Sequence, residues 1–249
     1  MRPLITKIKP AKGFSKVIYI FFNALLPIVV FVLVRTDFTQ LALAIILLSK
    51  WRMLAVRPRF WPANFRANAI DIIVGISFLL FMINSGSQLM QLIWTVGYII
   101  WLVVLKPAAN TLLISLQAYI GLMAGLMALF VSWNDGPLYG LVFLTGLVCY
   151  LSARHFFDSF DEPYAKLLSY FWGYFGAALV WVLGHWLLYY SFVSQPVLLL
   201  GALSFGLGTL YYLDHKDRLS VGLRRQFVFI MFAVIFIVLI FSDWGDKIV

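Results

Sequence analysis

The sequence has few charged residues and almost no cysteine. Only 12% of its 249 residues are Asp, Glu, Lys or Arg, whereas 63% are hydrophobic. A soluble globular domain carries about 25% charged residues, so this composition excludes one. The single cysteine, Cys149, permits no internal disulfide and no thiolate metal cluster. Such a composition is typical of a protein embedded in a lipid membrane.

Motifs of several well-known enzyme and channel classes are also missing. The sequence contains no HExxH zinc motif, no P-loop and no GxSxG elbow. It has neither the arginine ladder of a voltage sensor nor a TVGYG-like selectivity filter. We therefore predict neither a metal ion nor a cofactor, and we favour a protein without catalytic activity over an enzyme.

Long apolar segments dominate what is present. A lipid core about 30 Å thick is crossed by roughly 17 to 25 helical residues, and nine segments meet or approach that length. We expect an all-α, polytopic transmembrane helix bundle over 17–241, with a basic N-terminal segment 1–16 before it and a short tail 242–249 after it. The predicted spans are 17–34, 38–56, 69–84, 88–105, 110–131, 138–157, 163–190, 196–213 and 226–241.

The basic residues alternate with these spans. Of the 19 Lys and Arg, 17 fall in the N-terminal segment and in every second loop, which leaves only Arg35 and Lys247 on the other side. Because cytoplasmic loops retain Lys and Arg, we predict a cytoplasmic N-terminus and an external C-terminus, in the plasma membrane or in a bacterial inner membrane. The same pattern explains the net charge of +9 without nucleic acid as a partner.

One loop, Lys50–Asn68, combines five basic residues with aromatic residues and no acid. Such a segment suits the headgroup level of a membrane, and we expect Arg52, Arg57, Arg59 and Arg66 to contact anionic lipid headgroups. The alternative is a specific phosphorylated ligand held by forked arginine contacts. Asn68 and Asp71 have the spacing of an N-cap and its third helical residue, so we expect both to begin the third span.

Polar residues inside the predicted spans give a candidate intramembrane site. Stripes at helical spacing, rich in small and polar residues, mark the faces on which three spans are expected to pack inward. They are Asn110, Gln117, Gly121, Ala124 and Ala128 in the fifth span, Gly173, Ala177, Trp181 and His185 in the seventh, and Gly201, Ser204, Gly208 and Tyr211 in the eighth. This pattern predicts that His185, Gln117 and Tyr211 face the inside of the bundle, where a carrier or channel would have its cavity. His185 is an intramembrane ionisable residue and therefore a functional candidate, although no carboxylate stands at its depth. The competing interpretation is packing alone.

The one acidic cluster on the predicted cytoplasmic side follows the sixth span. His155, Asp158 and Glu162 are three and four residues apart, with Asp161 beside them. On a continuous helix these side chains would share a face and hold a divalent cation that binds a phosphate. Pro163 favours the alternative, a turn in which Asp161 or Glu162 caps the seventh span.

Three functions stay open at this point. The chain is a carrier or channel for a small solute, or a non-catalytic subunit or scaffold that binds another membrane protein or its own copies. The third hypothesis is a membrane-embedded enzyme that acts on a lipid or phosphorylated substrate through the two cytoplasmic loops. A cavity lined by Gln117, Tyr211 and His185 would favour the first hypothesis, and convergence of the two loops would favour the third.

Overall fold

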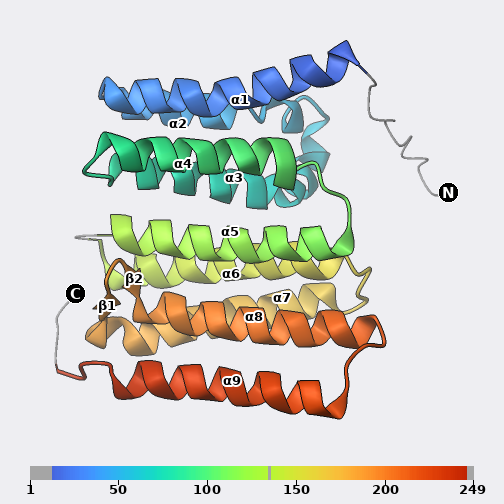
Figure 1. Ribbon diagram of the computed structural model, residues 1–249, viewed down its shortest axis with the longest axis vertical. Coiled ribbons are helices and arrows are strands. Elements are labelled where there is room, and N and C mark those ends of the chain that lie inside the picture. Colours follow the sequence, from blue (N-terminus) through green and yellow to red (C-terminus); the bar gives the residue numbers. More distant parts are fainter. Residues whose placement is uncertain (1–12, 134–135, 246–249) are drawn as a thin grey trace.

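The computed structural model describes residues 13–133 and 136–245, and the helices of this part lie side by side as one bundle (Figure 1). The bundle is formed by α1 (Phe14–Arg35), α2 (Thr39–Leu48), α3 (Trp61–Ile83), α4 (Gln88–Ile100), α5 (Thr111–Ser132), α6 (Leu138–Asp158), α7 (Ala165–Leu183), α8 (Gln195–His215) and α9 (Val221–Ile240). Shorter elements connect them: the 3-10 turns η1 (Trp51–Met53), η2 (Pro58–Phe60) and η4 (Gly184–Trp186), the π-helical segment η3 (Trp101–Leu105), and the strands β1 (Tyr189–Tyr190) and β2 (Val193–Ser194).

The predicted helical membrane bundle is confirmed. Within the described residues, eight helical segments are long and apolar enough to cross a membrane, which makes the chain a multi-pass membrane protein. Figure 1 shows that α1 begins at one end of the bundle and α9 finishes at the other. Most of the predicted terminal segments, residues 1–12 and 246–249, lie outside the described residues.

The second predicted span differs most from the sequence-based expectation. Its helix, α2, has only 10 residues and is therefore about 15 Å long, half the thickness of the lipid core. The chain then returns to the end of the bundle where α1 begins through η1 and η2 (Figure 1). Trp61 holds this non-helical stretch, because its indole Nε1 donates to the carbonyls of Leu54 and Val56 at 3.1 and 3.0 Å.

Two other boundaries move for local reasons. α3 begins at Trp61, eight residues before the predicted span, with Pro62 in its first turn, where proline is well tolerated. α7 ends at Leu183, because the next residues form η4 and then a two-stranded hairpin in which Tyr190 pairs with Val193. The predicted seventh span, which continued to residue 190, is therefore too long.

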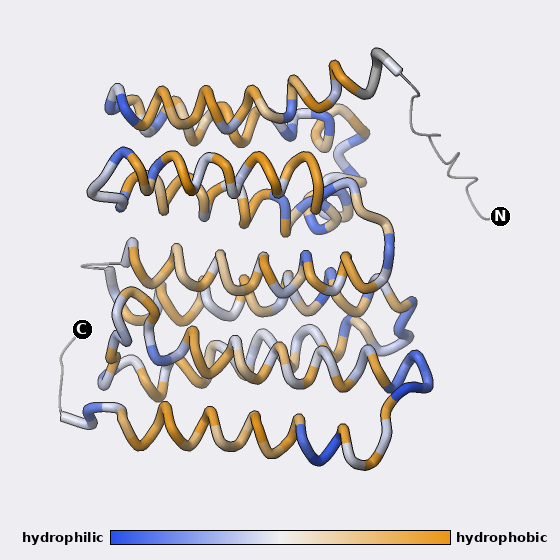
Figure 2. The backbone as a smooth tube through the Cα atoms, viewed as in Figure 1, coloured by the Kyte–Doolittle hydropathy of each residue, from blue (hydrophilic) through white to orange (hydrophobic). Residues whose placement is uncertain are grey.

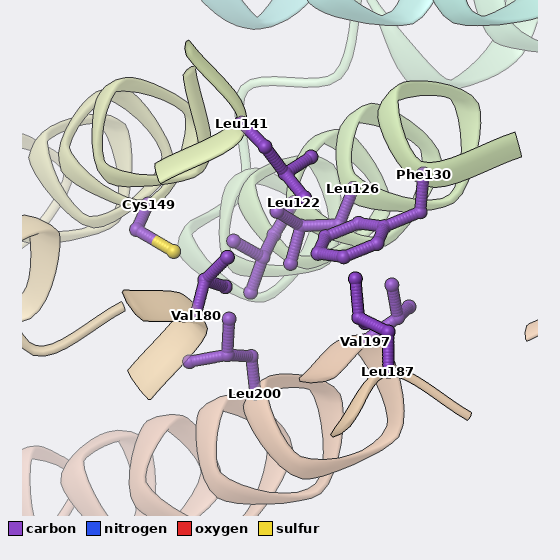
Figure 3. Packing of buried hydrophobic residues seen from close by; sticks show 9 residues of the cluster. All are labelled: Leu122, Leu126, Phe130, Leu141, Cys149, Val180, Leu187, Val197 and Leu200. Atoms are coloured by element: carbon purple, nitrogen blue, oxygen red, sulfur yellow. The ribbon is translucent and has the colours of Figure 1, made fainter. Parts of the chain in front are cut away.

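The helices pack as two neighbouring groups, α1–α4 and α5–α9. The core of the second group is a buried cluster from α5 to α8 and the segment after η4 (Figure 3), made of Leu122, Leu126, Phe130, Leu141, Cys149, Val180, Leu187, Val197 and Leu200. In the first group, buried residues of α3, α4 and η3 pack together: Ile70, Val74, Tyr98, Trp101 and Leu102.

Glycines bring the two groups into contact along α3 and α5. A Cβ atom at Gly121 would stand 2.8 Å from the side chain of Ile70, and one at Gly125 would stand 2.7 Å from that of Ile73. These approaches require glycine, as expected where small residues let membrane helices pack closely. The predicted inward stripe of α5 therefore forms the main contact between the groups.

Only the first part of the predicted inward stripe of α7 is buried. The stripe predicted to point inward ends at Trp181 and His185, and both side chains are exposed in the structure. The first member of that stripe, Gly173, is buried against α6, and Gly176 beside it is buried against Cys149, as expected. α7 ends at Leu183, so His185 lies in η4 and no longer follows the helical spacing of the stripe.

Charge is distributed unevenly between the two ends of the bundle. The loops α2–α3, α4–α5, α6–α7 and α8–α9 share the end at which α1 begins, and the hydrophilic colouring of Figure 2 is heaviest there. We call this the basic end, because it contains every described Lys and Arg apart from Arg35. The positive-inside rule predicts that the basic end faces the cytoplasm.

Candidate functional site

A buried ionic cluster lies between the α2–α3 loop, α3 and the end of α4. At its centre is the carboxylate of Asp71 on α3, whose Oδ2 accepts from the Lys50 ammonium and lies 2.6 Å from the Lys106 Nζ. Its other oxygen, Oδ1, accepts from the indole Nε1 of Trp101 at 3.0 Å. Both carboxylate oxygens therefore have partners, which come from the α2–α3 loop and from the end of α4.

The interruptions of α2 and α4 position these partners. α2 stops at Leu48, so Lys50 follows in a turn and reaches inward. α4 widens into the π-helical segment η3, in which the Lys106 N–H donates to the Trp101 carbonyl at 2.8 Å. Such a π-helical turn is frequent at functional sites, and here it turns both Trp101 and Lys106 toward Asp71.

The cluster lies deep in the bundle. The side chains of Lys50 and Asp71 are only 6% and 9% exposed, whereas that of Lys106 is 34% exposed. Asp71 stands 12 residues before the end of α3, or about 18 Å along its axis from the opposite end of the bundle. An ionisable group at this depth is costly unless paired, and is a functional candidate for that reason.

Asp71 was expected to cap the third span, and that expectation is wrong. Because α3 already begins at Trp61, Asn68 and Asp71 lie within the helix rather than at its start. The amide of Asn68 donates to the Asn64 carbonyl one turn earlier, at 2.9 Å. The carboxylate of Asp71 instead neutralises the lysines of two other segments.

A cavity of about 860 Å³ opens beside the cluster, between α1, η1, α3 and η3. Its polar wall includes three basic residues, Lys50, Arg52 and Lys106, and three asparagines, Asn23, Asn64 and Asn68. Among the described residues, no Asp or Glu lines it. With Asp71 counted behind the wall, the fully ionised cavity carries a net charge of about +2.

The remaining wall is apolar and belongs mainly to α1. It includes Phe22, Leu25, Leu26, Val29 and Ile45. From Tyr19 to Val29 the cavity follows α1 for about 15 Å, half the thickness of the lipid core. Phe22 is 62% exposed, so this wall reaches the outer surface of the bundle, where lipid would lie.

Comparisons with known proteins assign no relative to this chain. No family model, no curated protein and no solved structure matches it. The case for a function therefore depends on the geometry of the site itself.

The electrostatic environment of Lys106 favours its charged form. Burial tends to lower the pKa of the Lys106 ammonium, but the attraction and hydrogen bonding of Asp71 outweigh burial and raise the pKa above its usual value. Lys106 therefore stays protonated at neutral pH. Because it is also the more exposed lysine, it is the cation that a ligand in the cavity can reach.

The arginines of the predicted headgroup segment lie on the surface of the basic end. Arg52, Arg57, Arg59 and Arg66 are all exposed, and of these Arg52 lines the cavity. The guanidinium of Arg59 lies 4.6 Å from the centre of the Phe60 ring. The structure thus brings one of the four arginines together with Lys50 and Lys106.

The predicted intramembrane trio is not assembled. His185 belongs to η4, at the end of the bundle opposite the basic end, and its imidazole is exposed beside Trp186. Gln117 and Tyr211 lie near the basic end, on α5 and α8, with partners of their own. The hydroxyl of Tyr211 donates to the Glu162 carboxylate. A shared cavity for these three side chains is therefore not formed.

The acidic residues at and after the end of α6 do not form one cluster. Asp158 pairs with Arg154 at 2.9 Å, Glu162 accepts from Tyr211, and Asp161 is exposed in the turn with a φ of 53°. The described residues contain no group of three or more His, Cys, Asp or Glu side chains that could hold a metal ion. His155 points elsewhere, toward Gln117, at 3.2 Å.

Sequence reasoning did not select the three residues that form the cluster. From the sequence pattern, Lys50 and Lys106 are loop charges and Asp71 is part of a helix cap. One signal was present, since Asp71 is an acid flanked by a long apolar run, and Trp61-Pro62 is itself a helix-start pattern. Placing the start of α3 at Pro62 would have left Asp71 inside the membrane and in need of a cation.

Proposed function

We propose that this membrane protein binds an anionic amphiphile, a lipid or lipid-like molecule with a phosphate-bearing headgroup, in the cavity between α1, η1, α3 and η3. The observation that carries the proposal is the joint lining of one cavity by Lys50, Arg52 and Lys106 and by the apolar face of α1. The volume of about 860 Å³ is in the range of ligand pockets.

The two walls suit the two parts of such a ligand. Arg52 and Lys106 supply charge-assisted hydrogen bonds to phosphate oxygens, and the asparagine amides add neutral donors. Phe22 and Leu25, both exposed toward lipid, offer contact to a hydrocarbon chain that enters from the side. Positive-inside topology would place the headgroup in the cytoplasmic leaflet, where anionic lipids are concentrated.

Binding is tested by exchanging the protein into nanodiscs of phosphatidylcholine that contain phosphatidic acid or phosphatidylglycerol with the same chains, followed by native mass spectrometry. We expect the wild-type protein to retain the anionic lipid, and Arg52→Gln to weaken retention about tenfold, because a hydrogen bond to a charged group contributes about 1.5–3 kcal/mol. Arg224→Gln is the matched control, since Arg224 is exposed at the same end but outside the cavity.

A competition experiment shows whether the site binds an amphiphile or a free anion. Inorganic phosphate and glycerol phosphate, added at concentrations up to those of the lipid, should not displace the bound lipid if its chain contributes to binding. Equal retention of phosphatidylcholine and the anionic lipids, or equal loss in the Arg52 and Arg224 variants, would refute the proposal.

One observation favours transport of this ligand as a second candidate function. Non-helical backbone at membrane depth is tolerated where it is buried or lines a cavity, and transporters use such broken helices at their binding sites. α2 ends about halfway across the bundle, and Ser49–Met53 then line the cavity. Movement of a fluorescent anionic lipid between the leaflets of reconstituted vesicles, slowed by Arg52→Gln, would distinguish a carrier from a binding protein.

A further inference from the structure

The turn that carries Lys106 is held from behind by α5. The side-chain Nε2 of Gln117 donates to the Leu105 carbonyl at 2.5 Å and to the Ala108 carbonyl at 3.3 Å. These two carbonyls flank Lys106 and Pro107, at the point where the π-helical segment ends. Gln117 is only 6% exposed, so this contact is protected from water.

His155 on α6 completes the arrangement. Its Nε2 lies 3.2 Å from the Oε1 of Gln117. Because the Gln117 amide nitrogen faces two carbonyl oxygens, which can only accept, its oxygen must face His155 and accept in turn. The imidazole therefore carries its proton on Nε2 and donates it to Gln117, which fixes both the amide orientation and the tautomer.

A continuous set of contacts thus joins α6 to the ionic cluster. It leads from His155 to Gln117, then to the backbone on either side of Lys106, and from the Lys106 ammonium to Asp71. The first two members lie outside the lining of the cavity, so they cannot touch a ligand there.

We propose that His155 and Gln117 are positioning residues for Lys106, and that they set the affinity of the cavity for the anionic headgroup. The inference rests on the proposed function. The Lys106 ammonium pairs with Asp71 and also lines the cavity. A small displacement of the turn that carries Lys106 therefore changes the distance between its ammonium and a ligand in the cavity. Through His155, the last turn of α6 acquires an influence on a ligand that it does not contact.

A double-mutant cycle in the same nanodisc assay tests this role. His155→Ala should weaken retention of phosphatidic acid about fivefold, while retention of phosphatidylcholine stays within about twofold, since coupled residues show interaction energies worth such factors. In a Lys106→Gln background the same substitution should change retention less than about twofold, because the cation that it positions is gone.

Two amide variants separate positioning from general support of the fold. His155→Gln can still donate to the Gln117 oxygen and should retain phosphatidic acid almost as the wild-type protein does. His155→Asn is polar but shorter by one methylene group, and should behave as His155→Ala. If His155→Ala does not fold, the comparison of His155→Gln with His155→Asn still tests the positioning role. His185→Ala, at the opposite end of the bundle, is the matched control for loss of an imidazole.

The outcomes separate this inference from the proposed function. If Arg52→Gln and Lys106→Gln lose the anionic lipid but the His155 variants do not, or if His155→Ala acts equally with and without Lys106, the positioning role is refuted and the binding site stands. If none of the cavity variants changes retention, the binding site itself is refuted.

Discussion

Replacing Asp71 by asparagine is the sharpest test of the buried cluster. Asparagine keeps the size of the side chain but removes the negative charge that Lys50 and Lys106 share. The Lys50 ammonium, only 6% exposed, is then left as an uncompensated buried charge. Removing one partner of a buried ion pair costs about 3–5 kcal/mol, so we expect Asp71→Asn to lower the free energy of unfolding by about that amount.

The expected change is large enough to measure in detergent. For a chain of 150–250 residues, each kcal/mol shifts the unfolding midpoint by about 2–4 °C, which gives a loss of about 6–20 °C for Asp71→Asn. The measurement is thermal unfolding of purified protein at one fixed scan rate, because membrane proteins often unfold irreversibly. Asp37→Asn is the control, since Asp37 is exposed in the α1–α2 turn and its φ of 60° suits asparagine.

A second variant shows whether charge is the cause. Lys50→Met removes the buried ammonium and keeps an unbranched apolar side chain, so Lys50→Met/Asp71→Asn leaves Lys106 alone, which is 34% exposed and can reach water or headgroups. We expect the double variant to be more stable than Asp71→Asn, by a clearly non-additive margin. Additive losses, or an Asp71→Asn midpoint equal to that of Asp37→Asn, would contradict the role of Asp71 as the shared counter-ion.

Two further predictions concern the fold. A Cβ atom at Gly173 would stand 2.9 Å from a backbone oxygen of α6, so Gly173→Ala should cost about 1–3 kcal/mol, whereas Gly86→Ala, with no atom within 4 Å, should leave the unfolding midpoint unchanged. Equal midpoints for the two variants would contradict the close packing of α6 on α7. For topology, Thr36→Cys and Lys216→Cys should react with a membrane-impermeant maleimide from opposite sides of the membrane, with Lys216→Cys labelled from the cytoplasm, while buried Cys149 stays unlabelled. Labelling of both from one side would contradict the crossing pattern.

Much of the bundle could be predicted from the sequence, because the signals that define membrane helices are local. Apolar runs of sufficient length and the turn residues between them predicted α4, α5, α6 and α8 to within a few residues. The buried stripe of α5, with Gly121 at its centre, followed from helical spacing alone. For α7 the same spacing placed Gly173 correctly but not Trp181 and His185, because which side of a helix is inward depends on its neighbours.

The candidate site could not be predicted in the same way. The partners of Asp71 come from positions 21 residues before it and 30 and 35 residues after it, and their meeting depends on where α2 and α4 break. Pro107 was visible in the sequence, but the widening of the helix before it into a π-helical segment was not. The spacing of Asn68 and Asp71 predicts a helix cap, because local spacing contains no information about contacts with lysines far away in the sequence.

The short α2 and the buried cluster have a common physical origin. Successive residues of an α-helix are turned by about 100°, so Lys50 and Arg52 on a continuous helix would point in nearly opposite directions. One of the two cations would then face lipid in the last third of the second span, where Asp71 could not reach it. Ending the helix at Leu48 lets Lys50 turn in to Asp71 while Arg52 lines the cavity. The same break places Ser49–Met53 in the cavity wall. The end of α2 at Leu48 therefore accounts both for the difference from a simple nine-span bundle and for part of the candidate binding site.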